Sequence, residues 1–320
     1  MEHLAGKRNL WFTISGLLLV PCFISLLVWG LNFGIDFTGG SAWEVQYDRH
    51  VNTEDMTRVL TETGRPEVTV QQVGDSGLHR YLIRLRELAE GSEEKANLTN
   101  ALETLGTLDD DAEALETVGA SVGRSIRDRS VLAVAAASVG VLLYIAYAFR
   151  GTQNPILYGV CAIVAMLHDA LFVLGVFSIL GHFFGVEIDA LFITALLTVI
   201  GFSVHDTIVV FDRIRENLKL NPDDSFEEIV NHSVGQTLVR SVNTSITVVI
   251  TLLALLLFGG STTREFVLAL LIGTIAGTYS SIFNASQLLV AWQYGEIQGW
   301  FRKFTRFGRR PVHGPSINEA

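Results

Sequence analysis

The stretch ALFITALLTVIGFSVHDTIVVF, residues 190–211, is the part of the chain that best indicates its fold. At a rise of about 1.5 Å per residue, a helix of this length crosses a hydrocarbon core of roughly 30 Å. It nevertheless carries a carboxylate, Asp206, near one end. An ionised carboxylate in a membrane helix costs about 2.5 to 3.5 kcal/mol on insertion scales, so it normally faces a bundle interior and has a partner. The stretch therefore predicts a membrane-spanning helix whose carboxylate has a functional role.

Five further apolar runs accompany this stretch. They are residues 10–33, 131–149, 156–180, 238–258 and 266–292. Hydrophobic residues make up 49% of the 320 residues, and their concentration in these runs argues against an ordinary soluble domain. The first run follows Lys7 and Arg8 but is longer than the apolar part of a signal peptide, about 7 to 15 residues, so we expect a retained anchor. The sequence predicts an α-helical membrane protein with six transmembrane helices.

Basic residues in the short loops predict the orientation of these helices. Cytoplasmic loops are enriched in Lys and Arg. The basic residues that all fall on one side are Lys7, Arg8, Arg150, Arg213, Arg215, Lys219, Arg302, Lys303, Arg306, Arg309 and Arg310. We therefore expect both termini in the cytoplasm. After the fourth run, Pro222 and the acidic residues behind it predict a short interfacial helix that ends at Val230.

The insert between the first two runs, residues 36–129, predicts a soluble domain on the outer side. It holds 10 basic and 19 acidic side chains, which accounts for most of the net charge of −10, and this acidity does not suggest nucleic acid as a partner. Its alternating and capped segments predict the order βαββαβ, which is that of an α+β ferredoxin-like domain. This insert divides the rest of the chain into three further parts. They are 1–35, the cytoplasmic N-terminus and first helix; 130–295, helices two to six with short loops; and 296–320, a basic cytoplasmic tail.

The fifth run contains a cation that matches Asp206. Arg240 lies near the end where the fifth helix enters from the same side, so we expect the two groups at about the same depth and paired across neighbouring helices. Polar residues recur around Arg240 at spacings of three and four, which places them on one helix face. They are Gln236, Arg240, Asn243, Thr244, Thr247 and Thr251. One interpretation is a polar pathway, and the other is ordinary hydrogen bonding of hydroxyls to backbone or to neighbouring helices.

The dipeptide His-Asp occurs in two consecutive runs, at His168–Asp169 and His205–Asp206. Adjacent residues of a helix point about 100° apart, so we expect neither pair to share one face. For Asp169 a proton relay and a structural hydrogen bond both stay open, whereas for the histidines we favour structural contacts. We expect no metal site, because a metal needs more convergent ligands than these runs supply.

Five sequence blocks carry a resemblance to a known family. They are GIDFTGG (34–40), ETVGASVG (116–123), LHDA (167–170), GFSVHDTIVVFDRIREN (201–217) and QTLVRSVNTS (236–245). These blocks resemble those of the SecF family, the smaller membrane subunits of the bacterial SecDF protein-export complex in the resistance-nodulation-division superfamily. Ala120 departs from the proline that the family often has in the second block. The resemblance implies one half of a transporter of this superfamily, with a soluble domain after the first helix.

The resemblance also implies a function and partners. It implies a subunit in the bacterial inner membrane, among membrane lipids, that works with SecD, the SecYEG translocon and YajC to promote export of a translocating polypeptide. This export is driven by the proton gradient, and no other cofactor is implied. The positions that match the family's proton-moving aspartate and arginine are Asp206 and Arg240, and we place Asp169, Asn243, Thr244 and Thr247 on the same pathway. Gly34, Asp36, Gly39 and Gly40 belong to the signature at the junction with the outer domain, where the glycines form either a hinge or a simple tight turn.

Two other functions stay open. One is a half-transporter of the same superfamily that exports small molecules or lipids with a partner. The other is a non-conducting scaffold in which Asp206 and Arg240 form a structural ion pair, as buried pairs can. We do not expect an enzyme, because no Ser/His or paired-Asp arrangement at matched depth is evident in the sequence.

Overall fold

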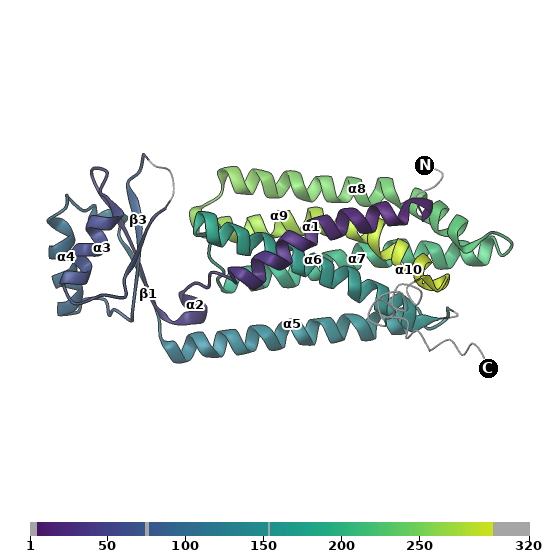
Figure 1. Ribbon diagram of the computed structural model, residues 1–320, viewed down its shortest axis with the longest axis horizontal. Coiled ribbons are helices and arrows are strands. Elements are labelled where there is room, and N and C mark those ends of the chain that lie inside the picture. Colours follow the sequence, from purple (N-terminus) through teal and green to yellow (C-terminus); the bar gives the residue numbers. More distant parts are fainter. Residues whose placement is uncertain (1–4, 74–76, 153, 297–320) are drawn as a thin grey trace, which may run out of the picture.

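The protein is described from a computed structural model, which covers residues 5–73, 77–152 and 154–296 (Figure 1). Within these residues, six helical segments are long and apolar enough to cross a membrane. They are α1 (Arg8–Val28), α5 (Ala120–Ala148), α6 (Pro155–Phe184), α7 (Ala190–Leu220), α8 (Phe226–Phe258) and a continuous segment made of α9 (Arg264–Ser280), the π-helix η4 (Ser281–Ala285) and α10 (Ser286–Gln293). Short 3₁₀ turns occur at Ala5–Lys7, Asp110–Ala112 and Ser261–Thr263. The prediction of a six-helix membrane protein is confirmed.

The membrane helices form a bundle with a buried centre and an exposed periphery. Half or more of the apolar window of α6, α7 and the α9–α10 segment is buried, against 17% or less in α1, α5 and α8. Figure 1 shows α5 and α8 at opposite margins of the bundle, with α6, α7 and α9 between them. The outer faces of α1, α5 and α8 are therefore available to lipid or to another protein.

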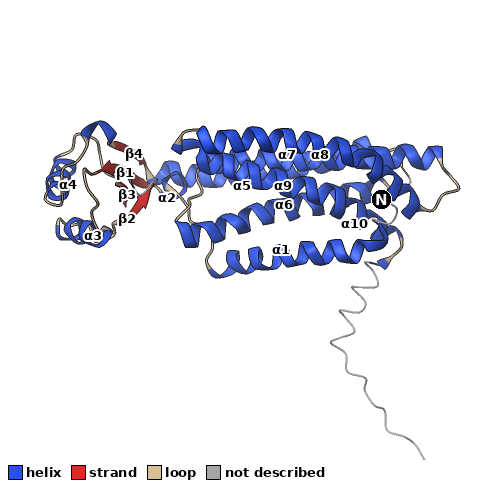
Figure 2. Ribbon diagram, turned by 90° about the horizontal axis from the view of Figure 1, so that it is seen from above, coloured by secondary structure: helices blue, strands red, loops and turns tan. Residues whose placement is uncertain are grey.

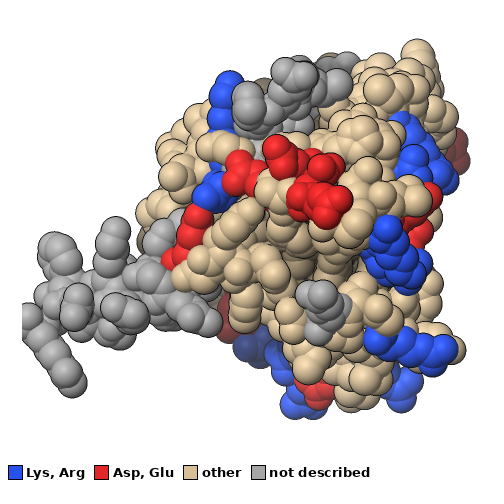
Figure 3. All heavy atoms as spheres, turned by 90° about the vertical axis from the view of Figure 1, so that its right-hand side faces the viewer, with Lys and Arg blue, Asp and Glu red and all other residues tan. Residues whose placement is uncertain are grey.

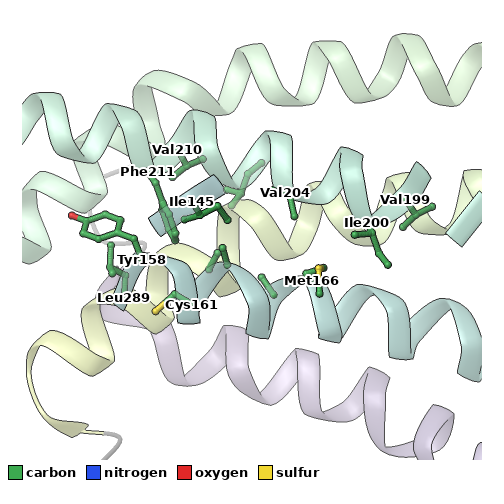
Figure 4. Packing of buried hydrophobic residues seen from close by; sticks show 14 of the residues in the cluster. Ile145, Tyr158, Cys161, Met166, Val199, Ile200, Val204, Val210, Phe211 and Leu289 are labelled. Carbon is green, nitrogen blue, oxygen red and sulfur yellow. The ribbon is translucent and has the colours of Figure 1, made fainter. Parts of the chain in front are cut away.

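Aromatic and aliphatic side chains fix the packing of the central helices at one end (Figure 4). The ring of Tyr158 on α6 stacks on Phe149 with centroids 5.2 Å apart and meets Phe211 of α7 edge-on at 5.3 Å. Ile145 of α5 and Leu289 of α10 belong to the same fully buried cluster. Four helices are therefore held in register by one hydrophobic cluster.

The outer domain has the predicted βαββαβ order. Its elements are β1 (Gly40–Gln46), α3 (Thr53–Glu62), β2 (Thr69–Val73), β3 (Arg80–Leu85), α4 (Glu93–Glu103) and β4 (Ala114–Val118). The strands form one antiparallel sheet in the order β2-β3-β1-β4. Trp43 of β1 and Tyr81 of β3 are fully buried in the same cluster as Met56 of α3 and Leu98 of α4. Figure 2 shows both helices on the side of the sheet that faces away from the membrane bundle.

Two predicted boundaries differ from the structure. The prediction of a separate helix from Pro222 to Val230 is wrong. Ser225 caps α8, and this helix continues without a break to Phe258. The Ser225 hydroxyl accepts from the Glu228 backbone N–H at 3.3 Å, and the Glu228 carboxylate accepts from the Ser225 N–H at 3.0 Å, which is a complete capping box. The second difference concerns the outer domain, whose predicted end at residue 129 falls inside α5. Nearly all of the predicted tail, 296–320, lies outside the described residues.

Candidate functional site

Two carboxylates are buried in neighbouring central helices. Asp169 of α6 is fully buried, and Asp206 of α7 is 3% exposed. Both positions were predicted from the sequence as members of a proton pathway. Their hydrogen bonding differs, and so does what each can do chemically.

Asp169 has a complete set of donors from three helices. Its Oδ2 accepts hydrogen bonds from the hydroxyls of Ser203 on α7, at 2.5 Å, and Ser280 on α9, at 2.6 Å. Its Oδ1 lies 3.0 Å from Nδ1 of His168. His168 and Asp169 leave the helix about 100° apart, but their side chains are close enough for this contact. These bonds to one carboxylate hold together the helices that supply them.

Further hydroxyls continue this network along α7. Thr207 donates to the Ser281 hydroxyl at 3.0 Å, and Ser281 donates to the Ser203 carbonyl at 2.9 Å. Gly277 allows α9 to approach this closely, since a Cβ there would lie 3.3 Å from Cβ of Ser203 and 3.5 Å from Asp169 Oδ2. Directly after Ser280 the helix widens into the π-helical turn η4. Short π-helical turns are frequent at functional sites.

Asp206 lies on the same helix as this network but lacks its donors. Its Oδ2 is buried and has no hydrogen-bond partner among the residues that the structure describes. It also forms no ion pair with any residue that the structure describes. Leaving a buried carboxylate oxygen unpaired is costly, so the group favours either a proton or a partner from outside this chain.

The predicted contact between Asp206 and Arg240 is not present in the structure. Asn217 of α7 contacts Ser233 of α8 at 2.8 Å, and Arg213 contacts Gln236 at 2.6 Å. Continued along two antiparallel helices, this register places Asp206 level with about residue 244, so Arg240 lies one turn, roughly 6 Å, nearer the α7–α8 loop. Arg240 is moreover exposed, while Asp206 is buried. The two groups therefore differ in both depth and direction.

The polar face of α8 points out of the bundle. Its predicted pathway residues, Arg240, Asn243, Thr244 and Thr247, are all exposed. The Thr244 hydroxyl donates to the Arg240 carbonyl at 2.9 Å, and Thr247 donates to the Asn243 carbonyl at 2.9 Å, so both threonines are satisfied by their own helix. The side chains of Arg240 and Asn243 have no comparable bonds within the described residues. These two groups, rather than the threonines, require a polar environment beyond the chain.

The junction with the outer domain brings the signature residues against the start of α5 and α7. Between them lies the short helix α2 (Ile35–Thr38). Gly34 donates its N–H to the Ile188 carbonyl at 2.9 Å, and Asp36 accepts from the N–H of Ala190 at 2.8 Å. Gly39 has a φ of +73°, and a Cβ there would lie 2.6 Å from Cα of Ala120. Gly40 has a φ of +118°. The geometry requires glycine at both positions, while motion at this junction stays a prediction.

The sequence reasoning missed the donors of Asp169. The donors Ser203 and Ser280 were not singled out, nor were Ser281 and Thr207 of the adjoining network, although each lies inside an apolar run. The sixth run carries Ser280, Ser281, Asn284 and Gln287 at spacings of three and four. The argument from spacing that was applied to the fifth run finds Ser280 and Ser281 when it is applied to the sixth, but not Ser203 and Thr207 of the fourth run. His205, in contrast, is exposed on the surface of α7.

Comparison with known proteins places the chain in a family. A family model described as "Protein export membrane protein SecD/SecF, C-terminal" matches residues 97–295, and another described as "SecD/SecF GG Motif" matches residues 24–49. The chain is 53% identical to the protein translocase subunit SecF of Thermobaculum terrenum over 95% of this chain and 98% of that protein. The chain belongs to the SecF family. SecF of Anaerolinea thermophila is 42% identical over the same shares of the two chains.

Solved structures of SecDF have the same fold. A crystal structure of SecDF from Thermus thermophilus, described as a translocon-associated membrane protein, matches with a TM-score of 0.78 and 37% identity over 91% of this chain. SecDF in a super-membrane-facing form matches with a TM-score of 0.65 and 36% identity over 94% of this chain. This SecF-family chain covers 38% and 40% of those two chains. The resemblance noted in the sequence is confirmed, and the matched proteins are larger than this chain.

Proposed function

We propose that this chain is a subunit of an accessory complex that uses the proton-motive force to promote export of polypeptides through the Sec channel. The names of its relatives, protein translocase subunits SecF and SecDF, support a role in export. The observation that supports proton coupling is a buried oxygen of Asp206, on a central membrane helix, that has no partner within the described part of the chain.

Protonation of Asp206 changes the packing of α7 by a simple route. The charged form requires a donor or a cation near the buried oxygen, whereas the neutral form does not. A charge that crosses the membrane field gains about 2.3 kcal/mol per 100 mV, which is enough to bias a helix pair between two arrangements. The hydroxyls of Ser203 and Thr207 on α7, with that of Ser281 on the adjacent turn η4, extend the polar region toward Asp169.

The second part of the proposal assigns the partner. Arg240 and Asn243 lie on an exposed face of α8, and a cation facing lipid at this depth would cost several kcal/mol. In SecDF of Thermus thermophilus and Bacillus subtilis, the segment that matches this chain is 35% and 38% of a longer protein that also bears the SecD name. We therefore place SecD against the polar face of α8. Arg240 then acts within the interface, where a movement of either half brings it toward or away from Asp206.

The surroundings of the complex follow from the same reasoning. The ends of α1 and α10 meet at one end of the bundle, where Arg8 is paired with Glu296, and the excess of basic loop residues lies there too. We place this end in the cytoplasm and the outer domain on the opposite side of the bacterial inner membrane. The SecYEG channel, YajC and the translocating polypeptide are the further partners, and the subunit does not act as an enzyme.

The test is proton-driven export in vesicles that contain the complex with SecD. Asp206→Asn keeps the shape of the side chain and loses its titration, so we expect normal assembly and loss of the stimulation by an imposed proton gradient. Asp212→Asn is the matched control, because Asp212 is on the same helix but is exposed and paired with Arg215. Full stimulation with Asp206→Asn would remove Asp206 from the proton path and favour the scaffold function.

A further inference from the structure

A cavity of about 350 Å³ opens at the end of the bundle where α6 begins and α7 ends. Its wall combines residues of the α5–α6 turn, the first turn of α6, the last turns of α7 and the end of α10. Its polar, charged and apolar lining residues include Thr152, Tyr158, Arg215, Lys219, Phe226 and Leu289. None of them belongs to the carboxylate site, which lies deeper in the bundle.

The polar part of the wall is cationic. Arg215 and Lys219 lie one turn apart on α7, and both line the cavity. Arg215 donates to the Ala148 carbonyl at 3.1 Å and is paired with Asp212, so its guanidinium is held in place. Lys219 has no acidic partner within the described residues, and its side chain is exposed. One oriented and one free cation at the same cavity favour an anionic ligand.

The first turn of α6 adds to this positive field. Its N-cap, Asn154, makes no side-chain capping hydrogen bond, and Pro155 occupies the first helical position. Within the described residues, the first N–H groups of α6 therefore receive no cap from the Asn154 side chain. Because the N-terminus of a long helix carries a partial positive charge, it stabilises an anion placed beside Arg215 and Lys219.

The rest of the wall is apolar. Leu157, Leu218, Phe226 and Leu289 line the same cavity. A small inorganic anion gains nothing from such a wall, whereas an amphiphile buries hydrocarbon against it. Arg215 lies four residues beyond Phe211, where the apolar run ends, so it lies about 6 Å past the hydrocarbon boundary. That is the level at which phospholipid headgroups occur.

The charges of this end of the molecule agree with such a ligand. Figure 3 shows the end face with Lys and Arg mainly near its outline and a group of Asp and Glu closer to its centre. Cations at the outline of a bundle meet the headgroups around it. Basic pockets between membrane helices on this kind of surface bind anionic lipid headgroups.

We propose that this cavity binds the phosphate of an anionic phospholipid, with Arg215 and Lys219 holding the phosphate and the leucines and Phe226 holding the glycerol and the start of the acyl chains. The bound lipid then bridges α6, α7 and α10 at the end of the bundle. This site does not depend on the proposed export function, because it rests only on the charges and shape of this cavity.

The experiment measures lipid binding to the purified chain by native mass spectrometry. The probes are phosphatidylglycerol, phosphatidylcholine with the same acyl chains, and soluble glycerol phosphate. We expect phosphatidylglycerol to bind more tightly than phosphatidylcholine. Lys219→Gln should weaken phosphatidylglycerol about fivefold, from roughly 1 kcal/mol per basic residue near the headgroups. Arg215→Gln together with Lys219→Gln should weaken it about 25-fold.

Arg213→Gln is the matched control, since Arg213 lies on the same helix but outside the cavity and is paired with Glu216. It should leave binding unchanged. If Arg215→Gln does not fold, Lys219→Gln alone still tests whether the cavity binds the lipid. The Lys219 side chain makes no ion pair within the described chain, so its removal should not disturb the fold. Equal weakening by Arg213→Gln and Lys219→Gln would overturn the site, as would equal binding of the two lipids. Displacement of the lipid by an equal concentration of glycerol phosphate would overturn the assignment to a lipid.

Discussion

The carboxylate of Asp36, on the short helix after the first span, accepts a hydrogen bond from the backbone N–H of Ala190 at 2.8 Å. Ala190 is the first residue of α7, the helix that carries Asp206. The chain between Asn32 and Gly34 also forms two backbone hydrogen bonds with Ile188, at 2.8 and 2.9 Å. The stalk of the outer domain is therefore bonded directly to the start of the helix on which the proposed proton site lies.

Removing the carboxylate of Asp36 should loosen this connection. Asp36→Ala takes away an acceptor at the N-terminus of α7, and losses of this kind cost about 1 kcal/mol. We expect a lower thermal unfolding midpoint for the purified protein in detergent, and Asp36→Asn should recover part of the loss because its amide oxygen still accepts. Asp223→Ala, an exposed change in the loop between α7 and α8, is the control. Equal midpoints for Asp36→Ala and the unmodified protein would show that the bond adds no stability.

The glycine signature predicts a second difference. Gly39 and Gly91 have nearly the same backbone, with φ of +73° and +70°, but a Cβ at Gly39 would lie 2.6 Å from Ala120 Cα, and at Gly91 it meets nothing within 4 Å. Both Gly→Ala variants carry the strain of a positive φ, of order 1 kcal/mol. Only Gly39→Ala must also push the outer domain away from α5. We expect it to destabilise clearly more than Gly91→Ala in denaturant unfolding followed in detergent, and equal losses would show that close packing at Gly39 is unimportant.

The sequence was sufficient for the fold because the signals it uses are local. Apolar runs reveal membrane helices from their length alone, and the alternation in the outer domain reveals its strands. Helix continuity was harder to judge. The predicted stop near Val230 was wrong, because neither Gly235 nor the polar residues around it interrupt α8. Polar composition does not end a helix when its backbone bonds stay intact.

The site was predicted only in part, for a geometric reason. Asp169 and Asp206 were found because a carboxylate in an apolar run is conspicuous. The period of a helix shows that Arg240 and Asn243 share a face, but it does not show whether that face points into the bundle. That direction depends on packing between α7 and α8. Ser203 and Ser280 were missed because serines in membrane helices usually bond to their own backbone, and the sequence does not distinguish those that reach across.

The two serines that donate to Asp169 should contribute more to the free energy of unfolding than other buried serines do. Ser203→Ala and Ser280→Ala each remove a donor to the carboxylate, and bonds to charged groups contribute about 1.5 to 3 kcal/mol. Ser286→Ala is the control, because Ser286 is equally buried and donates to the Ile282 carbonyl of its own segment. We expect both first variants to unfold at clearly lower denaturant concentration than Ser286→Ala. If all three behave alike, Asp169 is not held by these hydroxyls.

The ion pair at the bundle end predicts a pH dependence. The hydrogen bond from Arg8 lowers the pKa of Glu296 below the usual 4.5. A lowered pKa in the folded state means that the contribution to stability is present above the usual value and is lost as the pH falls through the lower one. We expect stability to fall on acidification below about pH 4.5, and less steeply for Glu296→Gln. Glu103→Gln, an exposed change in the outer domain, should keep the original slope in thermal unfolding across this range.

Asp206 and Arg240 should act independently in the isolated chain and together in the complex. In the chain alone they share no contact and differ by about one turn in depth, so the effects of Asp206→Asn and Arg240→Met on unfolding should add within roughly 0.5 kcal/mol. In vesicles with SecD, the proposed interface brings Arg240 into the same proton site, and groups that act as a unit are not additive. There the double variant should be no worse than either single variant in proton-driven export, and Arg240→Lys should rescue only in part because an ammonium lacks the planar fork of a guanidinium. Coupling in the isolated chain would contradict the observed directions of the two side chains, and additive losses in the vesicles would contradict a shared site with the partner.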